Sequence, residues 1–552
     1  MFSLNKLTKS IFALITLFSV IYLSMVSAAF SFTQLDVQKG LTYLGYDPGP
    51  LDGKIGSKTK KAFKNFWFDY FNSEYAGKFS RADYRVIGLS LAELLEQGQK
   101  DQYATLNLPA LDTNFTRSFQ LKLPAEYPFT NGSPTPGHPK HEYTVQHPFV
   151  LDVNADGCSD VFFQFMDSYA HPRILLGGPN IKAKDAKEVR NWPKTRSIRN
   201  IKIRDLDGDQ KPDFVGFTAP HSLQGNGKFG SGLEEELLNL TTEGPSLSSL
   251  KTYAHSGILA DVNGDGVTDI FPVAEFPDRK QIAFLGNGQG KFNRQYNVKL
   301  PFKTVISDAL SVDLNGDGID DYVFTSAKDH RFSQYVTNKY YEKNGAVQIA
   351  FGEKGKSIDE LKFTAHGSHW MSDEHWVAWR LLHKNSEYGH TQVKDNAHTQ
   401  PSNVNTLDFD GDGDLDILIG FYAASNSAWM TSGFQILENV DGDFIEATKK
   451  FVPIQLGNQS LISPTGFLLH ATLADFSNDG VDDLVLTTSS GRTHNSVSTS
   501  LYVNHNGQYY PISAWSTRKY KVQTRLHIGD FNCDGKNDLL SGDGLYYSVS
   551  LR

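Results

Sequence analysis

The sequence predicts a mainly β fold of repeated four-stranded sheets, preceded by a small α-helical domain. A nine-residue acidic pattern occurs seven times between residues 152 and 538, with short apolar runs beside the copies. Most copies begin between 52 and 67 residues apart, a spacing typical of propellers and repeat arrays. Residues 33–96 instead carry apolar residues three and four positions apart, as in helices that bury one face. The 552 residues therefore divide into at least two domains.

The first 29 residues have the pattern of an export signal. Lys6 and Lys9 form a basic start, and residues 11–26 form an apolar run. Residues 27–29, Ser-Ala-Ala, are small enough for a signal peptidase. The alternative is an uncleaved membrane anchor. No other stretch approaches the roughly 18 consecutive apolar residues that span a bilayer. We therefore expect an exported protein of the periplasm, cell wall or extracellular space, with no membrane span after signal removal.

The segment after the signal predicts a small bundle of helices. A first helix has its apolar residues on one side and stops at Gly45. Ser57 is the expected cap of a second helix. The apolar stripe of the second helix consists of Ala62, Phe63, Phe66, Trp67 and Tyr70. Ser80 and Ser90 each precede an acidic residue by three positions, so one or both begin a further helix that runs through Glu96.

This bundle resembles the peptidoglycan-binding domain of bacterial cell-wall hydrolases over about 35 residues. The matching residues are Val37, Gln38, Leu44, Gly45, Tyr46, Asp52, Gly53, Gly56, Thr59, Ala62 and Phe66. Trp67 departs from the pattern, since glutamine commonly follows the last phenylalanine in that family. The resemblance implies a module that tethers the protein to the wall. The alternative is a helical bundle that packs on its neighbour and has lost wall binding.

The strongest signal is the repeated acidic pattern, whose copies we number loops 1 to 7. In chain order they read DVNADGCSD from Asp152, DLDGDQKPD from Asp205, DVNGDGVTD from Asp261, DLNGDGIDD from Asp313, DFDGDGDLD from Asp408, DFSNDGVDD from Asp475 and DFNCDGKND from Asp530. Every copy has Asp at positions one, five and nine, and Asn, Asp or Ser at position three. Loop 2, with Gln210 in place of glycine, and loop 6, with Ser477 at position three, are the weakest copies.

These loops predict calcium sites, up to seven of them and structural in role. Calcium takes six to eight oxygen ligands, which side chains at positions one, three, five and nine and the carbonyl at seven supply if the chain turns sharply. Glycine at position six allows that turn. The expected ligands are Asp152, Asn154, Asp156, Cys158, Asp160, Asp205, Asp207, Asp209, Lys211, Asp213, Asp261, Asn263, Asp265, Val267, Asp269, Asp313, Asn315, Asp317, Ile319, Asp321, Asp408, Asp410, Asp412, Asp414, Asp416, Asp475, Ser477, Asp479, Val481, Asp483, Asp530, Asn532, Asp534, Lys536 and Asp538. Magnesium fits less well, because it keeps more water. The alternative is that some loops are acidic turns without metal.

Each repeat is predicted to form one four-stranded propeller blade with its loop between the first two strands. After most loops a glycine turn follows a further strand, as in residues 284–292, 436–444 and 501–509. Together these features resemble the FG-GAP and VCBS repeats of integrin α-chain propellers and of many exported bacterial proteins. The resemblance covers roughly residues 115–552 and implies a calcium-binding loop in each blade.

The ends of the repeat region predict a closed ring of seven blades. Only 14 residues follow Asp538, which is room for the second and third strands of the last blade but not for its fourth. Residues 115–124, FTRSFQLKLP, match the fourth-strand segment FNRQYNVKLP at residues 292–301 at five of ten positions. We therefore expect residues 115–124 to complete the last blade as its outer strand, which removes an exposed sheet edge. The predicted boundaries are a signal at 1–29, a helical domain at 30–98, a linker at 99–114 and a propeller at 115–552.

The 95 residues between the starts of loops 4 and 5 predict insertions, with an eighth, metal-free blade as the alternative. The larger insertion, residues 358–403, would lie on the face opposite the calcium loops and holds six of the 17 His and three of the seven Trp. The candidate ligand-binding residues there are His366, His369, His375, Trp370, Trp376, Trp379 and Arg380. Three interpretations stay open. They are a transition-metal site that includes Asp373 or Glu374, a carbohydrate platform of stacking Trp rings, and a loop that packs on the propeller rim. The remaining histidines are His383, His390 and His398.

Cysteine content and charge narrow the function. Cys158 and Cys533 lie in the first and last loops, so ring closure would allow a disulfide between them. A net charge of −9 without any Lys/Arg cluster argues against nucleic acid. We expect a calcium-binding propeller that binds peptidoglycan, another glycan or a protein at the cell wall or surface. The alternatives are a polysaccharide lyase or hydrolase with its site on the insertion face, for which no catalytic residue stands out, and an integrin-type adhesin.

Overall fold

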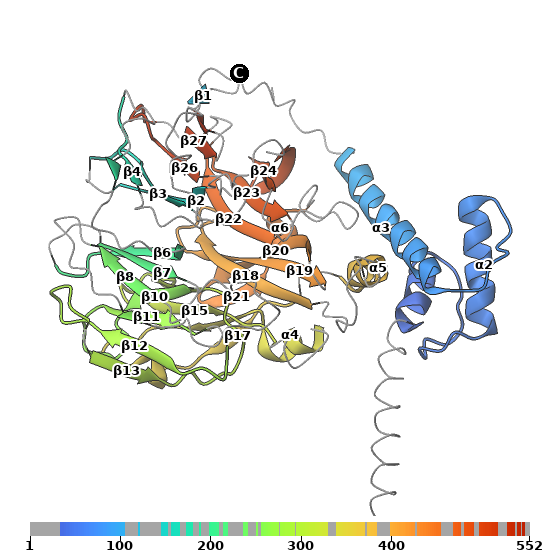
Figure 1. The fold of residues 1–552 in the computed structure, drawn as a ribbon, viewed down its shortest axis with the longest axis horizontal. Coiled ribbons are helices and arrows are strands. Elements are labelled where there is room, and N and C mark those ends of the chain that lie inside the picture. The colour runs from blue at the N-terminus through green and yellow to red at the C-terminus, as the bar shows by residue number, and fades with distance from the viewer. Residues whose placement is uncertain are drawn as a thin grey trace, which may run out of the picture. The chain divides into compact units, whose positions relative to one another are not determined.

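The structure is a computed structural model. It has helices in the predicted helical part and mainly strands in the predicted repeat part (Figure 1). It describes residues 34–104, 120–121, 145–152, 156–165, 173–179, 187–188, 198–208, 213–218, 236–240, 250–251, 256–274, 276–292, 294–328, 338–369, 372–383, 398–425, 428–453, 467–475, 480–490, 496–516, 527–535, 538–541 and 544–546. The predicted export signal lies outside these residues. No described helix is both long and apolar enough to cross a bilayer.

The chain divides into two compact units. The helical unit consists of Met1–Asp101 and Met371–Asp395, and the repeat unit consists of Gln102–Trp370 and Asn396–Arg552. The predicted insertion is therefore split, because its middle part clusters with the amino-terminal helices.

The described part of the helical unit contains four helices. They are residues 34–43, α2 (Ser57–Phe71), α3 (Arg81–Ala104) and α5 (Asp373–His383). The first ends where predicted, because Gly45 takes a φ of +88° and its N–H bonds the Thr42 carbonyl at 2.9 Å. The predicted cap at Ser57 is wrong, since Gly56 is the N-cap and no side chain caps α2.

The third helix begins at the first of its two predicted starts. The N–H and hydroxyl of Ser80 donate to the Asp83 carboxylate at 2.6 and 3.0 Å, whereas Ser90 lies buried inside the helix. α3 continues to Ala104, so the predicted linker is helical over its first six residues, 99–104.

Helix α5 completes the core of the helical unit. A Cβ added to Gly88 of α3 would lie 2.7 Å from Leu381 Cβ, and one added to Gly40 would lie 3.0 Å from Leu381 Cδ1. Glycine at both positions thus lets three helices approach closely. The Arg380 guanidinium bonds the Asp36 carboxylate in a buried ion pair across 344 residues of sequence.

The described residues of the repeat unit form seven four-stranded antiparallel sheets, numbered in the order of their loops (Figure 1). Sheet 1 consists of β2 (Val145–Leu151), β3 (Asp160–Phe165), β4 (Arg173–Leu175) and β5 (Lys187–Glu188). Sheet 2 consists of β6 (Ile198–Arg204), β7 (Asp213–Thr218), β8 (Glu236–Leu240) and β9 (Leu250–Lys251). Sheet 3 consists of β10 (Ser256–Ala260), β11 (Asp269–Val273), β12 (Gln281–Leu285) and β13 (Arg294–Val298). Sheet 4 consists of β14 (Ala309–Val312), β15 (Asp321–Thr325), β16 (Val347–Ala350) and β17 (Thr364–His366).

The last three sheets follow the same order, except that sheet 7 takes its outer strand from far upstream. Sheet 5 consists of β18 (His398–Leu407), β19 (Asp416–Ser425), β20 (Ala428–Val440) and β21 (Asp443–Glu446). Sheet 6 consists of β22 (Phe467–Ala474), β23 (Asp483–Ser490), β24 (Ser496–His505) and β25 (Gln508–Ser516). Sheet 7 consists of β26 (His527–Gly529), β27 (Asp538–Ser541), β28 (Gly544–Tyr546) and β1 (Gln120–Leu121). Gln120 pairs with Tyr546 and Leu121 with Leu545, within the segment for which the sequence predicts a closing strand.

Apolar side chains from consecutive sheets bury one another. Phe271 of sheet 3 packs in one cluster with Phe324 of sheet 4, and Val323 of sheet 4 packs in another with Phe421 of sheet 5. The same holds between sheets 2 and 3 and between sheets 5 and 6. Strands that are apolar on both faces, such as fully buried β11 and β15, follow from this stacking.

The long spacing between loops 4 and 5 holds helices, and the described residues there contain no further sheet. α4 (Asn338–Asn344) lies between the second and third strands of sheet 4, and α5 lies between sheets 4 and 5 in the chain. The short helix η3 (Ile358–Glu360) precedes the last strand of sheet 4, and α6 (Thr448–Phe451) follows sheet 5.

The ion pair between Asp36 and Arg380 yields a stability prediction. Asp36→Ala leaves the buried guanidinium without its carboxylate, so we expect the helical unit to lose about 3–5 kcal/mol of unfolding free energy. The control is Lys39→Ala, which removes a partly exposed contact with Asp373 and should cost about 0–1 kcal/mol. Hydrogen exchange of α3 and α5 amides in the full chain measures both. Equal effects of the two substitutions would contradict the prediction.

Candidate metal centres and their aspartate clasps

The aspartate at position one of each loop accepts hydrogen bonds from backbone N–H groups of the same loop. In loop 3, Asp261 Oδ1 accepts from Gly264 (2.7 Å) and Asp265 (3.0 Å), and its Oδ2 accepts from Gly266 (2.6 Å). Loop 4 repeats this, since Asp313 accepts from the N–H groups of residues 316, 317 and 318. In these loops the aspartate at position one therefore holds the turn together through backbone hydrogen bonds.

Positions three and five are oriented in the same way. The Asn263 amide oxygen accepts from the N–H of Asp265 at 3.0 Å, and Asp265 Oδ1 accepts from the N–H of Val267 at 3.0 Å. The chain turns at Gly264 and Gly266, whose φ angles of +82° and +83° favour glycine. The polar side chains thus lie on one side of a tight turn.

Two loops bring three carboxylates together in the way a cation site requires. One oxygen from each of Asp205, Asp207 and Asp213 lies within 4.8 Å of the others, and the same holds for Asp408, Asp410 and Asp416. Hard oxygen donors at this density suit calcium. Loops 3 and 4 keep the turn but have Asn263 and Asn315 at position three, so an amide oxygen would take the place of one carboxylate oxygen in their donor sets.

Burial, together with neighbouring carboxylates, raises the pKa of several loop aspartates. Burial, with the charges of Asp265 and Asp261, raises the pKa of Asp269 to about 7. Burial and neighbouring carboxylates also raise the pKa of Asp321 and of Asp416 to about 6. Asp414, an additional carboxylate at position seven of loop 5, has its pKa raised to about 6 by burial and by Asp412.

Position nine holds a buried aspartate in all seven loops. Their exposed fractions do not exceed 2% in Asp160, Asp213, Asp269, Asp321, Asp416, Asp483 and Asp538. Asp269 Oδ2 accepts from the N–H of Val262 at position two (3.0 Å), and Oδ1 accepts from Gly286 after the third strand (2.8 Å). The carboxylate therefore joins the loop to the end of the third strand, and we call this arrangement the aspartate clasp.

The clasp recurs in other sheets and explains the glycine turn. Asp321 bonds Leu314 and Gly352 at 2.8 Å each, and Asp416 bonds Phe409 and Asn439 at 2.9 and 2.8 Å. A Cβ on Gly286 would lie 2.2 Å from the position-eight carbonyl, and the equivalent distance at Gly352 is 2.3 Å. Only glycine permits this approach in sheets 3 and 4. We predicted the position-nine residues as ligands, and their clasp role escaped sequence reasoning although their invariance signalled it.

In the five loops whose position-two residue the structure describes, loops 2 to 5 and 7, the backbone carbonyl at that position joins the loop to the next sheet. Leu206 accepts from the N–H of Gly290, Val262 from the N–H of Ile358, and Leu314 from the Asn439 side chain, at 3.2, 2.9 and 2.9 Å. Phe409 accepts from the Tyr509 hydroxyl at 3.3 Å. In the same manner, Phe531 of loop 7 accepts from the N–H of Gly178 beside sheet 1, at 2.9 Å.

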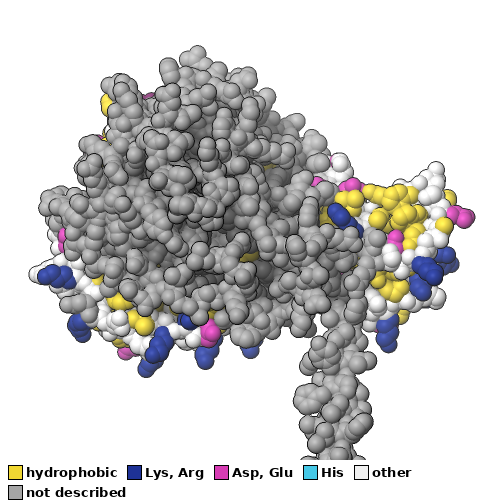
Figure 2. Space-filling view, in the orientation of Figure 1, with side chains coloured by type: hydrophobic (Ala, Val, Ile, Leu, Met, Phe, Trp, Pro, Cys, Tyr) yellow, Lys and Arg dark blue, Asp and Glu magenta, His cyan; other side chains and the backbone are white. Residues whose placement is uncertain are grey.

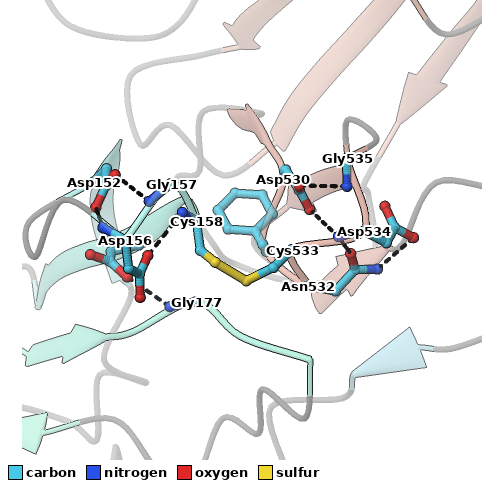
Figure 3. Close-up of a disulfide and its surroundings, with 12 residues drawn as sticks. Asp152, Asp156, Gly157, Cys158, Gly177, Asp530, Asn532, Cys533, Asp534 and Gly535 are labelled. Atoms are coloured by element: carbon cyan, nitrogen blue, oxygen red, sulfur yellow. Dashed lines mark hydrogen bonds between the residues drawn. A yellow bond between two sulfur atoms is a disulfide. The ribbon is translucent and has the colours of Figure 1, made fainter.

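Cys158 and Cys533 form a disulfide between loops 1 and 7 (Figure 3). Their Cα atoms lie 5.2 Å apart across 375 residues of sequence. Figure 3 shows the two sulfur atoms between the carboxylates of Asp152 and Asp530, each of which accepts backbone N–H bonds in its own loop.

Two of the three candidate tryptophans of the insertion are buried. Trp379 is fully buried and Trp376 is 4% exposed, and their rings stack on each other at 5.0 Å within the helical unit. Arg380, beside the Trp376 ring, is occupied by Asp36. A ring that stacks on a sugar needs a free face, so the carbohydrate platform does not fit these two tryptophans.

Three histidines of the insertion have local partners. His366 lies on β17 and bonds Thr364 at 2.8 Å, and buried His369 packs on Tyr341. His375 lies on α5 and bonds Ser372 at 2.8 Å. The two groups of potential metal ligands found among the described residues contain no histidine.

Some predicted site residues lie outside the described part of the chain or have no described side chain. These are Asn154, Asp209, Lys211, Ser477, Asp479, Lys536, Trp370, His383, His390 and His398.

Sequence reasoning also missed a polar network on the first strands of the sheets. Asp308, before β14, accepts from the Ser256 hydroxyl (2.6 Å) and from the N–H of Val404 (3.2 Å), which links sheets 3, 4 and 5. Lys202 of sheet 2 donates to the carbonyl of Ala309 at 3.0 Å. No local motif marks these residues, because their partners come from distant repeats.

The aspartate clasp predicts two separable effects of substitution. In chelator, Asp269→Ala leaves two buried N–H groups unbonded, and we expect a loss of about 1–3 kcal/mol for each. Exposed Asp265→Asn keeps its acceptor oxygen, so its stability in chelator should change by less than about 0.5 kcal/mol. Urea unfolding with and without calcium measures both variants. Equal stability of the two variants in chelator would contradict the clasp.

Comparison with known proteins agrees with the repeated sheets. The FG-GAP-like repeat family matches residues 261–324 and 475–541. Similar solved structures include the Vibrio cholerae biofilm matrix protein Bap1, with 12% identity over 75% of this chain and 89% of that chain and a TM-score of 0.28. The exotype rhamnogalacturonan lyase YesX aligns at 11% identity over 76% and 74%, with a TM-score of 0.37. Drosophila Semaphorin 1b, extracellular domains 1–2, aligns at 11% over 73% and 85%, with a TM-score of 0.30. No curated protein matches. The chain thus contains FG-GAP-like repeats within a mainly β fold of four-stranded sheets.

Proposed function

We propose that the protein is an exported, calcium-stabilised β-propeller that binds a glycan or protein ligand at the cell surface. The observation that carries the proposal is a recurrent loop in which backbone N–H groups donate to a carboxylate at the start of a tight turn. Asp261 and Asp313 accept such bonds in loops 3 and 4. Calcium would be held by the side chains at positions one, three, five and nine and the carbonyl at seven. It would neutralise the carboxylates and keep the strand turns closed.

We further propose that the seven sheets close into a seven-bladed ring. Two kinds of contact between the first and last sheets support closure, namely the Cys158–Cys533 disulfide and the bonds from Ser159 and Gly178 to loop 7. In addition, β1, which precedes sheet 1 in the chain, pairs with β28 inside sheet 7. Strands β2 and β26 also contact each other. These contacts remove the exposed edges that an open array would leave.

The helical unit is the proposed tether to peptidoglycan or another wall glycan. Its helix α2 exposes Phe68, Tyr70 and Phe71, each more than 40% accessible, and Figure 2 shows hydrophobic side chains gathered on this unit. Lys60, Lys61 and Lys64 are exposed one to three turns earlier. Exposed aromatic rings can stack on sugar faces, and the lysines suit acidic groups of a wall polymer.

We favour binding over the enzymatic alternative for a structural reason. The carboxylates whose pKa values rise most belong to the repeated loops, as Asp269 and Asp321 do. The aromatic and basic residues of the insertion, Trp379 and Arg380, belong to the helical core. The candidate ligand-binding residues Trp379 and Arg380 therefore have structural partners.

Calcium removal is the direct test of the metal proposal. We expect the mature chain to lose thermal stability in chelator and to regain it in calcium, by about 2.7 kcal/mol for a site held at 100 times its Kd. Magnesium at equal concentration should restore less. The affinity should fall as the pH falls from 7.5 to 5.5, since the raised pKa values of Asp269, Asp321 and Asp416 make protons compete with the ion. An unchanged melting temperature in chelator would refute structural calcium.

The tether is tested by co-sedimentation of the mature chain with purified peptidoglycan sacculi. Phe68→Ser with Phe71→Ser should weaken binding about tenfold, equivalent to about 1.4 kcal/mol, because the stacking surface is lost. The control is Ile203→Ser with Ile445→Ser, which changes two exposed apolar residues of the repeat unit that lie outside the acidic loops. Equal pelleting of both double variants, or none of the wild type, would reject the tether.

A further inference from the structure

The disulfide lies inside two candidate cation loops and not merely near them. Cys158 occupies position seven of loop 1, the position whose carbonyl is an expected ligand, and Cys533 occupies position four of loop 7. The cross-link therefore joins a ligand position of the first loop to the turn of the last one.

Cys533 holds a left-handed backbone conformation that glycine takes at the same position in loops 2 to 5. Its φ is +60°, and position four of loops 2 to 5 is glycine with φ between +73° and +82°. A non-glycine residue adopts this conformation at a cost. The two residues that follow, Asp534 and Gly535, donate their N–H groups to the Asp530 carboxylate at 3.0 and 2.8 Å. We call these two donors the cradle of Asp530. The cross-link thus restrains the turn that aims these groups.

The other end of the cross-link is equally integrated. The N–H of Cys158 donates to Asp156 Oδ1 at 2.9 Å, and the residue is 8% exposed. The next residue, Ser159, donates its N–H to the Asp530 carbonyl at 2.8 Å (Figure 3 shows the surroundings). Loop 1 and loop 7 therefore share both a covalent bond and a backbone hydrogen bond.

We propose that the Cys158–Cys533 disulfide is a redox-sensitive latch that couples the thiol state to cation affinity in loops 1 and 7. This inference rests on the proposed calcium function. A dithiol reductant would attack one sulfur, release the other as a thiolate, and leave as its own cyclic disulfide, so that two cysteine thiols form and the reductant is oxidised. Freed of the cross-link, Cys533 can leave the left-handed conformation and the cradle of Asp530 relaxes.

Coupling of this kind is reciprocal. If reduction weakens calcium binding in two loops, calcium binding must oppose reduction by the same factor. The latch would be closed in an oxidising compartment, where disulfides persist. Loops 2 to 6 contain no cysteine, so they provide an internal reference within the same molecule.

Calcium titration of the mature full chain, oxidised and after treatment with dithiothreitol, tests the latch. We expect reduction to weaken two sites by about 5- to 150-fold and to leave the others unchanged. In the reverse experiment, we expect calcium to lower the extent of thiol release at equilibrium in a dithiothreitol buffer. A doubly substituted chain, Cys158→Ser with Cys533→Gly, has no thiol to release and controls for calcium binding by the reductant itself.

The same variant separates the link from the strain. Glycine at 533 adopts the left-handed conformation freely, so loop 7 should recover part of its affinity relative to Cys158→Ser with Cys533→Ser. Site affinities that are identical in the oxidised and reduced chains would overturn the latch alone. A chain that binds no calcium in either state would overturn the proposed function and the latch with it.

Discussion

The buried aspartate at position nine is the interaction on which the repeat unit depends. A carboxylate without exposure is stable only if its oxygens are bonded, and in sheet 3 Asp269 meets this requirement with one N–H from the loop and one from the turn after the third strand. Three segments of one sheet are therefore held by a single side chain. The same burial, with the nearby charges of Asp261 and Asp265, raises the pKa of Asp269 to about 7. A cation in the loop would offset the repulsion between Asp269 and these two carboxylates. The proposed calcium would thus keep the clasp carboxylate charged.

The loops also connect neighbouring sheets. The backbone carbonyl at position two accepts a hydrogen bond from the following sheet, as Leu314 does from the Asn439 side chain. Asn439 in turn donates its N–H to the clasp carboxylate of its own sheet, Asp416, at 2.8 Å. A residue that serves a clasp and a sheet-to-sheet bond makes the order of one loop depend on its neighbour. Phe531 and Gly178 repeat the contact between the last loop and the first sheet.

Local pattern sufficed for the parts of the fold that repeat. The loops, the strands beside them and the glycine turn follow from spacing, and the residues that pair with β28 lie in the segment that resembles a fourth strand. Pattern failed where a residue's partner is set by distant chain. We did not predict helix α5 within the insertion, and nothing local indicates that Arg380 pairs with Asp36. The clasp was missed for another reason. An aspartate carboxylate can either bind calcium or accept backbone hydrogen bonds, and the sequence does not distinguish these two roles.

Both units are completed by contacts that span most of the chain, and this constrains how they form. Arg380 reaches Asp36 across 344 residues, and the two cysteines are separated by 375. Closure of such long loops costs conformational entropy that the bond must offset, although the cost grows only slowly with length. Neither the helical core nor the contact between the first and last sheets exists until the later part of the chain is present. The amino-terminal helices therefore do not form a complete unit by themselves, because α5 supplies part of their core. The proposed tether has to be tested in the full chain for the same reason.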